Sequence, residues 1–92
     1  MNIKHHQENK KGSFHYDEKG ETLAEMTYSA PKDDRIIIEH TEVDPSLRGK
    51  GIGKALIEES VKWARKNNVK VVPECRFAKK ILTSSSSYQD VL

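Results

Sequence analysis

The first half of the chain has the alternating apolar and polar pattern that is typical of β-strands. Residues 22–29 place Ala24, Met26 and Tyr28 on one face and mostly polar side chains on the other, as in a strand buried on one side. A short aromatic-bearing segment, residues 13–16, precedes this strand, and the residues between them contain a glycine suited to a turn. The pattern therefore predicts a β-hairpin.

Two further strands are indicated by runs of β-branched residues. Residues 31–34 resemble a turn, and residues 35–43 follow with the apolar run 36–38 and no glycine or proline. This is the profile of a central strand covered on both faces, with polar groups at its far end. Residues 69–72 are short and β-branched, and Pro73 ends their pairing.

The pattern changes to a helical period in the second half of the chain. At about 100° per residue, residues 52–66 place one apolar arc opposite a charged arc, which predicts a helix over residues 47–67. The apolar arc contains Ile52, Gly53, Leu56, Ile57, Ser60, Trp63 and Ala64. Apolar residues at helical spacing predict a second short helix over residues 75–83. Residues 84–87, all serine, could form a flexible link, and apolar residues beyond them could dock the tail.

These elements predict an α/β (α+β) fold with a mostly antiparallel sheet, one long amphipathic helix and a short C-terminal helix. With 92 residues, the chain is short for a doubly wound nucleotide-binding fold or a barrel, so we expect one domain over residues 1–92. Hydrophobic residues make up 35% and charged residues 33%, against roughly 45–50% and 25% in globular proteins. The core should therefore be thin.

Composition also limits the partners that we expect. The net charge is +2, and lysine pairs at 10–11 and 79–80 lack interleaved aromatic residues, so nucleic acid is not an expected partner. No apolar run approaches the roughly 20 residues that span a bilayer, and the polar start lacks a secretory signal. The single Cys75 cannot form an intramolecular disulfide, so we expect a cytoplasmic protein, either a monomer or a weak dimer.

The histidines do not suggest a metal site. They stand at positions 5, 6, 15 and 40, and with one cysteine they offer no ligand spacing. His5 and His6 would point to opposite faces of a strand, and we interpret both as surface residues.

A glycine-rich turn between the central strand and the long helix is the strongest chemical signal. Gly49, Gly51 and Gly53 alternate there with Lys50 and Ile52, and Arg48 and Lys54 flank them. Glycines free the turn of Cβ atoms, and the free N–H groups and dipole of a helix start favour phosphate. The sequence is neither a P-loop nor a dinucleotide fingerprint, because Arg48, Lys54 and Ala55 stand where those motifs need other residues.

Residues 43–56 resemble the acetyl-CoA-binding segment of the GNAT superfamily of N-acetyltransferases. The hallmark of that segment is Arg or Gln, two residues, Gly, one residue, and Gly or Ala, and Arg48, Gly51 and Gly53 match it. Residues 40–43 and 72–75 further resemble a minimal branch of about ninety residues. The resemblance implies a GNAT-like fold and acetyl-CoA as cosubstrate, without a metal.

The same resemblance implies which residues bind the cofactor. In the family, the strand before the turn lends main-chain groups to pantetheine, and the amides of the turn bind pyrophosphate. Carried over to this chain, the cofactor-binding residues are Thr41, Glu42, Val43, Arg48, Gly49, Lys50, Gly51, Ile52, Gly53 and Lys54. Many members carry a tyrosine early in the helix after the next strand, where this chain has residues 75–78, Cys-Arg-Phe-Ala.

The candidate catalytic residues are Cys75, His40 and Glu39. Acetyl transfer to an amine needs a base for the amine and an acid for the leaving thiolate. His40 and Glu39 end an apolar strand and are the candidate bases, although adjacent strand residues should face opposite ways, with Glu42 on the face of His40. Cys75 precedes a helix, which favours its thiolate, so it could accept the acetyl group, donate a proton, or simply pack.

The sequence thus predicts an acetyl-CoA-dependent N-acetyltransferase acting on an amine of a small molecule or protein. The alternative is a noncatalytic acyl-CoA-binding or partner-interaction domain, suggested by the missing tyrosine.

Overall fold

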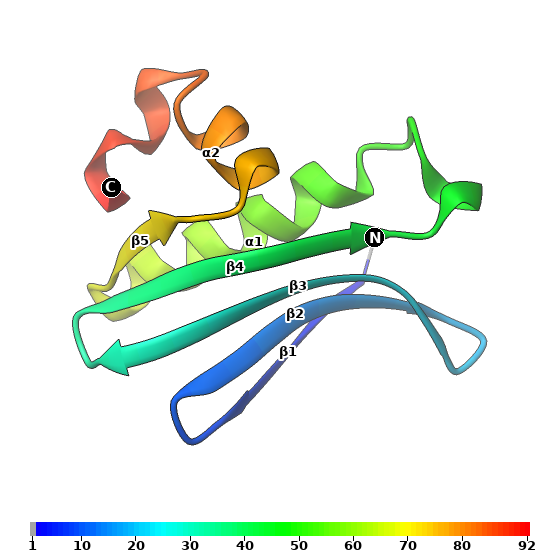
Figure 1. Cartoon of the computed structure of the whole chain (residues 1–92), viewed down its shortest axis with the longest axis horizontal. Coiled ribbons are helices and arrows are strands. Elements are labelled where there is room, and N and C mark those ends of the chain that lie inside the picture. The colour runs from blue at the N-terminus through cyan, green and yellow to red at the C-terminus, as the bar shows by residue number, and fades with distance from the viewer. Residues whose placement is uncertain (1) are drawn as a thin grey trace.

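The computed structural model describes residues 2–92 and contains a single five-stranded sheet with the strands in chain order (Figure 1). The strands are β1 (Ile3–Glu8), β2 (Lys11–Glu18), β3 (Glu21–Lys32), β4 (Arg35–Val43) and β5 (Lys70–Pro73). The first four strands pair antiparallel, and β5 runs parallel to β4 after the crossover through the long helix. The predicted mixed fold with a mostly antiparallel sheet is confirmed.

Two α-helices and two 3₁₀ segments follow the hairpins. They are η1 (Pro45–Leu47), α1 (Ile52–Asn67), α2 (Arg76–Leu82) and η2 (Ser86–Val91). The expectation that the long helix starts at residue 47 is wrong, because Gly49 and Gly51 have φ angles of +80° and +75°, which no α-helix contains. The helix ends as its sequence indicates, with Asn68 in the left-handed region.

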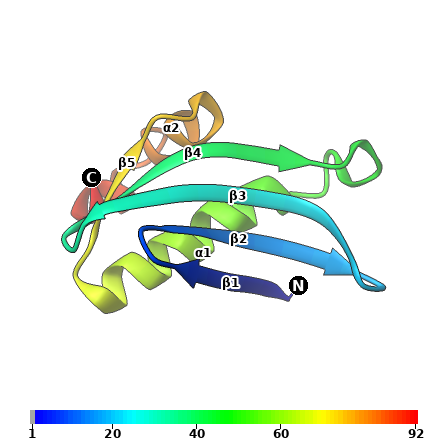
Figure 2. The same ribbon diagram turned by 60° about the horizontal axis from the view of Figure 1, so that its bottom comes forward.

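The core lies between α1 and one face of the sheet (Figures 1 and 2). The predicted inner face of β3, which carries Ala24, Met26 and Tyr28, is buried as expected. It packs with apolar residues of the neighbouring strands and with the apolar arc of the helix, to which the structure adds Val61. Since the helix contributes residues one turn apart to one face, its amphipathic period is what closes the core.

The other face of the sheet is not covered by a helix among the described residues, which corrects the expectation that β4 is buried on both faces (Figure 2). Ile36 and Ile38 are buried, but Ile37 is half-buried and Glu39 and His40 are exposed. The helices lie on one side of the sheet because α1 is long enough to cross it and α2 packs on α1. We call the uncovered side the open face.

Strand β1 is not apparent from the sequence pattern. Ile3 is its only apolar residue, so alternation does not reveal it. It is placed by backbone pairing with β2 and by His5, whose ring stacks on Phe14 with centroids 4.0 Å apart and bonds to the Tyr28 hydroxyl at 2.5 Å. His5 and His6 are both exposed as residues, as expected, but the His5 ring contributes to packing.

The C-terminal tail is anchored rather than loosely linked. Ser85 caps η2, and Arg65 of α1 donates to both carboxylate oxygens of Asp90, at 2.8 and 2.9 Å. Val91 is buried, whereas Leu92 is exposed. Docking of the tail is therefore confirmed for Val91 and not for Leu92. None of the helices among residues 2–92 combines the length and apolar character needed to cross a membrane.

Candidate functional site

The turn between β4 and α1 is shaped by two glycines. Gly49 and Gly51 adopt φ angles of +80° and +75°, a region that residues with a Cβ rarely adopt. A Cβ added to either glycine would have no other atom within 4 Å. Both glycines are therefore required by backbone conformation, and the space in front of them is open.

The start of α1 presents unpaired backbone donors to this open space. The first helical bond runs from the Ala55 N–H to the Gly51 carbonyl at 3.0 Å. The N–H groups of Ile52, Gly53 and Lys54 come before it and have no acceptor among residues 2–92. No side chain caps them, so together with the positive end of the helix dipole they favour an anion.

Three cations surround the same donors. Arg48, Lys50 and Lys54 are exposed, and no carboxylate within residues 2–92 lies in ion-pair distance of them. Neighbouring carboxylates therefore do not neutralise their charge, which is available to a ligand. The arrangement suits a phosphate or pyrophosphate group.

A pocket of about 420 Å³ continues from this turn between β4, α1 and α2. It is lined by Thr41, Val43, Leu47, Arg48, Gly49, Gly51, Ile52, Gly53, Lys54, Phe77 and Ile81. Most of the residues implied as cofactor ligands thus surround one pocket, but Glu42 and Lys50 are not among its lining residues. Leu47, Phe77 and Ile81 are additional; the sequence signal for the last two is helical spacing, which predicts the helix over residues 75–83 but not a place in the pocket.

The pocket follows the end of β4 as far as Thr41, near the point where β4 and β5 separate. Their pairing ends at Ile38 and Pro73, and the N–H groups of Glu74 and Cys75 both donate to the Ile38 carbonyl, at 3.0 and 3.1 Å. Beyond Ile38, no other strand of the described chain pairs with this edge of β4. Main-chain groups of residues 39–43 are therefore available to an extended ligand.

Cys75 lies at this separation point, at the N-terminus of α2. Its half-buried thiol donates to the Thr41 hydroxyl across 3.7 Å. Burial acts to raise the pKa of Cys75, but the backbone at Ala78, the Thr41 hydroxyl and the backbone at Phe77 together hold that pKa below its ordinary value. The environment thus favours the thiolate, which is the nucleophilic form.

Glu39 and His40 lie on the opposite side of β4 from Cys75. The register pairs Tyr28 with Ile38 and Thr27 with His40, so Glu39 is the extra residue of a β-bulge. A bulge interrupts the alternation of faces, and both residues are exposed. The expectation that they face opposite ways is therefore wrong. Glu42, paired with Glu25, is also exposed, as expected for the face of His40.

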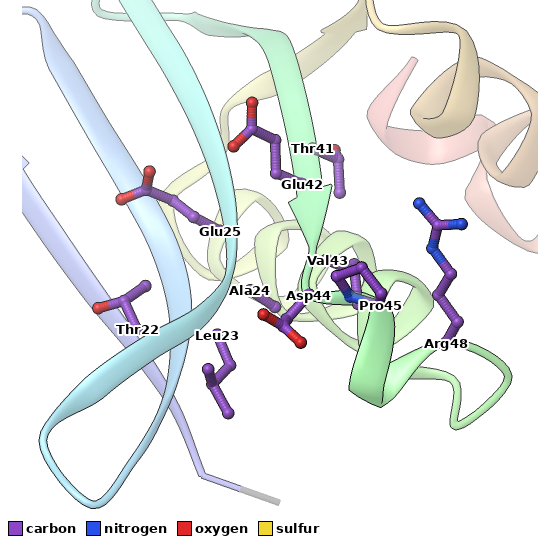
Figure 3. A pocket seen from close by; sticks show the side chains of 10 residues that line it. All are labelled: Thr22, Leu23, Ala24, Glu25, Thr41, Glu42, Val43, Asp44, Pro45 and Arg48. Atoms are coloured by element: carbon purple, nitrogen blue, oxygen red, sulfur yellow. The ribbon is translucent and has the colours of Figure 1, made fainter.

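A second hollow, of about 740 Å³, lies where β3 begins and β4 ends (Figure 3). It is lined by residues 22–25, 41–45 and Arg48. In Figure 3 the Glu25 and Glu42 carboxylates lie on one side of β4, and the Arg48 guanidinium lies on the other. The hollow shares Thr41, Val43 and Arg48 with the smaller pocket, so the end of β4 is reached from both.

Among residues 2–92, no group of three or more His, Cys, Asp or Glu side chains is placed to hold a metal ion. The candidate site therefore consists of backbone donors, cations, a thiol and an apolar pocket.

Comparison with protein families gives a match over most of the chain. The family model described as GCN5-related N-acetyl-transferase matches residues 13–91. A comparison with curated protein sequences found no match.

Solved structures with the same fold include one close relative in sequence. A GCN5-like protein from Staphylococcus aureus, solved by NMR, is 41% identical, with a TM-score of 0.71, over 98% of this chain and 87% of its own. The ribosomal-protein-alanine N-acetyltransferase from Brucella melitensis is 20% identical, with a TM-score of 0.65, over 80% of this chain and 61% of its own.

A third structure, a GNAT family acetyltransferase from Elizabethkingia anophelis with acetyl-CoA bound, is 14% identical, with a TM-score of 0.63. The match covers 80% of this chain and 51% of that protein. The chain thus spans between half and two thirds of the two larger enzymes, and their likeness concerns the fold alone. The family match over most of the chain and the 41% identical relative together show that this chain belongs to the GCN5-related N-acetyltransferase family.

Proposed function

We propose that the protein is an acetyl-CoA-dependent N-acetyltransferase that acts on an amine of a small molecule or protein. The observation that carries the proposal is the left-handed glycine turn, which presents unpaired N–H groups of α1 to a pocket lined by Thr41, and the Thr41 hydroxyl accepts a hydrogen bond from the Cys75 thiol. The pocket joins a pyrophosphate-binding end to a potential reaction centre, as an acyl-CoA requires.

The cofactor would lie along the pocket in a single orientation. The pyrophosphate would accept hydrogen bonds from the amides of residues 49–54, with Arg48, Lys50 and Lys54 balancing its charge. The pantetheine arm would then follow the unpaired edge of β4 and bond to main-chain groups of residues 41–43. This role for Glu42 needs only its backbone, so the exposed position of its side chain is compatible with it.

Two routes for the acetyl group are compatible with the side chains near the separation of β4 and β5. In the direct route, His40 or Glu39 removes a proton from the amine, whose nitrogen attacks the thioester carbon. The C–S bond breaks, and the CoA thiolate takes a proton, for which Cys75 is the candidate donor. The amine approaches from the open face, where both candidate bases lie.

In the two-step route, the Cys75 thiolate attacks the acetyl carbon and the CoA thiolate leaves. His40 or Glu39 then removes a proton from the amine, whose nitrogen attacks the acetyl-cysteine. The C–S bond to Cys75 breaks, the Cys75 thiolate is restored, and the proton passes to the departed CoA thiolate. The lowered pKa of Cys75 favours this route because it increases the thiolate fraction.

Intact-mass spectrometry after mixing with acetyl-CoA distinguishes the two routes. The two-step route predicts one acetyl adduct that hydroxylamine removes, and Cys75→Ala should lose the adduct while still binding CoA. If Cys75 acts only as a proton donor, no adduct forms, so the rates of acetylation must be measured as well. If Cys75→Ala acetylates an identified acceptor at the wild-type rate, Cys75 is neither nucleophile nor acid.

Turnover separates the proposed enzyme from a noncatalytic acyl-CoA-binding or partner-interaction domain. The protein should release free CoA from acetyl-CoA faster in the presence of a suitable amine, drawn from a panel of polyamines, amino acids, aminoglycosides and basic peptides. Gly51→Val is the matched control, because it should abolish release. Binding of CoA without release for any amine would favour the noncatalytic alternative.

A further inference from the structure

Phe77 is a large apolar residue whose side chain is exposed within a pocket. Its side chain lies in the first turn of α2 and is 41% exposed, although it lines the pocket between α1 and β4. Among residues 2–92, Val72 and Leu92 are the other large hydrophobic residues with similar exposure, at 37% and 42%, and neither lines that pocket. An exposed aromatic ring inside a pocket is apolar surface that a ligand can cover.

The Phe77 ring occupies its position because residue 53 is a glycine. A Cβ added to Gly53 would lie 2.8 Å from Phe77 Cζ, 3.0 Å from Phe77 Cε2 and 3.4 Å from Val43 Cγ2. The φ of Gly53 is not positive, so its backbone would accept other residues. Unlike Gly49 and Gly51, Gly53 is therefore needed for space and not for conformation, and the space is filled by the Phe77 ring.

The contact also locates the ring along the pocket. Gly53 is in the first turn of α1, beside the unpaired N–H groups, and Val43 is at the end of β4 on the way to Thr41 and Cys75. The Cβ position of Gly53 is therefore next to both the Phe77 ring and the Val43 side chain. Phe77 follows Cys75 closely in α2 and its ring reaches Gly53, so Phe77 extends from the end of the site that holds the thiol towards the end that suits pyrophosphate.

We infer that Phe77 is a binding residue for the pantetheine arm of an acyl-CoA, and that Gly53 sets the position of its ring. The inference rests on the proposed function, because it assumes that an acyl-CoA occupies this pocket. The exposed side of the ring packs against the arm when the cofactor binds, and it does not touch the phosphates. A bulkier residue at position 53 pushes the ring into the path of the arm.

Affinities for CoA and for ADP, measured by NMR titration, test the assignment. ADP carries the pyrophosphate but no pantetheine arm. Phe77→Ala should weaken CoA binding about tenfold, the change that about 1.4 kcal/mol produces, and leave ADP binding unchanged. Phe77→Leu should retain most of the affinity for CoA. Val72→Ala and Leu92→Ala are matched controls, because they remove equally exposed apolar side chains outside the pocket.

A double-mutant cycle tests the link between the two residues. Gly53→Ala should weaken CoA binding about threefold or more when Phe77 is present, and by less than about twofold in the Phe77→Ala background, because the clash is then absent. An equal effect in both backgrounds would show that position 53 acts on the cofactor without the ring.

The results that overturn the inference differ from those that overturn the proposed function. Wild-type affinity for CoA in a folded Phe77→Ala protein, or an equal loss of CoA and ADP binding, removes Phe77 from the pantetheine site and leaves the acyl-CoA proposal standing. Thermal unfolding of each variant shows that it is folded. Absence of CoA binding by the wild-type protein overturns both.

Discussion

At the scale of single residues, the glycines of the turn have different functions. Gly49 and Gly51 permit left-handed backbone, whereas Gly53 leaves room for Phe77. The sequence motif specifies glycine at position 51 and glycine or alanine at position 53, and it leaves position 49 open. It does not reveal these structural reasons, because backbone angles and a distant aromatic ring are properties of the folded chain.

Gly51→Val should abolish detectable CoA binding. The β-branched side chain resists the φ of +75° and projects into the open space that the phosphates would occupy. The variant should also be destabilised by about 1–2 kcal/mol, the strain of a left-handed residue. Isothermal titration with CoA and chemical denaturation measure the two effects.

Gly20→Val is the control for that strain. Gly20 has a φ of +80° and no atom within 4 Å of an added Cβ, but it lies in the turn between β2 and β3, away from the pocket. It should lose similar stability and bind CoA normally. Normal CoA binding by folded Gly51→Val would mean that the turn does not hold the phosphates.

At the scale of secondary structure, β1 is held by backbone pairing with β2 and by the side chain of one histidine. The His5 ring contacts Phe14, Tyr28 and Trp63, and burial, followed by the nearby charge of His6, lowers the pKa of His5 below the ordinary value of 6.5. The unfolded chain therefore binds a proton to His5 more readily than the folded chain does. The stabilisation is present above pH 6.5 and is lost as the pH falls below it.

Thermal unfolding between pH 8 and pH 5 measures this effect. The melting temperature of the wild-type protein should fall more steeply below pH 6.5 than that of His5→Gln, which cannot take up the proton. The other three histidines are present in both proteins, so the difference between the two profiles belongs to His5. Identical profiles would show that the pKa of His5 is the same in the folded and unfolded chains.

The C-terminal 3₁₀ segment should contribute to stability mainly through one apolar side chain. Val91 is 2% exposed and Leu92 is 42% exposed. Val91→Ala should cost about 1–3 kcal/mol of unfolding free energy, from lost burial and the resulting cavity, whereas Leu92→Ala should cost less than about 0.5 kcal/mol. Equal values in urea denaturation would contradict the docked position of the tail.

Elements with a local apolar period could be predicted from the sequence, whereas elements that depend on contacts between distant residues could not. The helix at 52–67 and the inner face of β3 are apparent because their apolar periods are local. Strand β1 depends on pairing and on His5 contacts across the sheet, and the bulge at Glu39 depends on the register between β3 and β4. Neither leaves a periodic signal, so the faces of Glu39 and His40 could not be predicted.

At the scale of the whole molecule, the candidate functional residues lie on both sides of the sheet. The side that carries the helices contains the glycine turn, the pocket and Cys75, while the open face carries Glu39 and His40. The residues proposed to bind the cofactor form two nearby segments, 41–43 and 48–54, so a local motif could suggest them. The pocket wall from α2 could not be suggested in this way, because it comes from another part of the chain.

The central claim is that acyl-CoA binds along the glycine turn and the end of β4, and an NMR titration with CoA tests it most directly. The amide resonances of residues 41–43 and 49–54 should shift most, and saturation should occur at micromolar to millimolar CoA, as expected for a small and partly exposed site. Shifts confined to the lysine pair at residues 79–80, with the turn unaffected, would contradict the account.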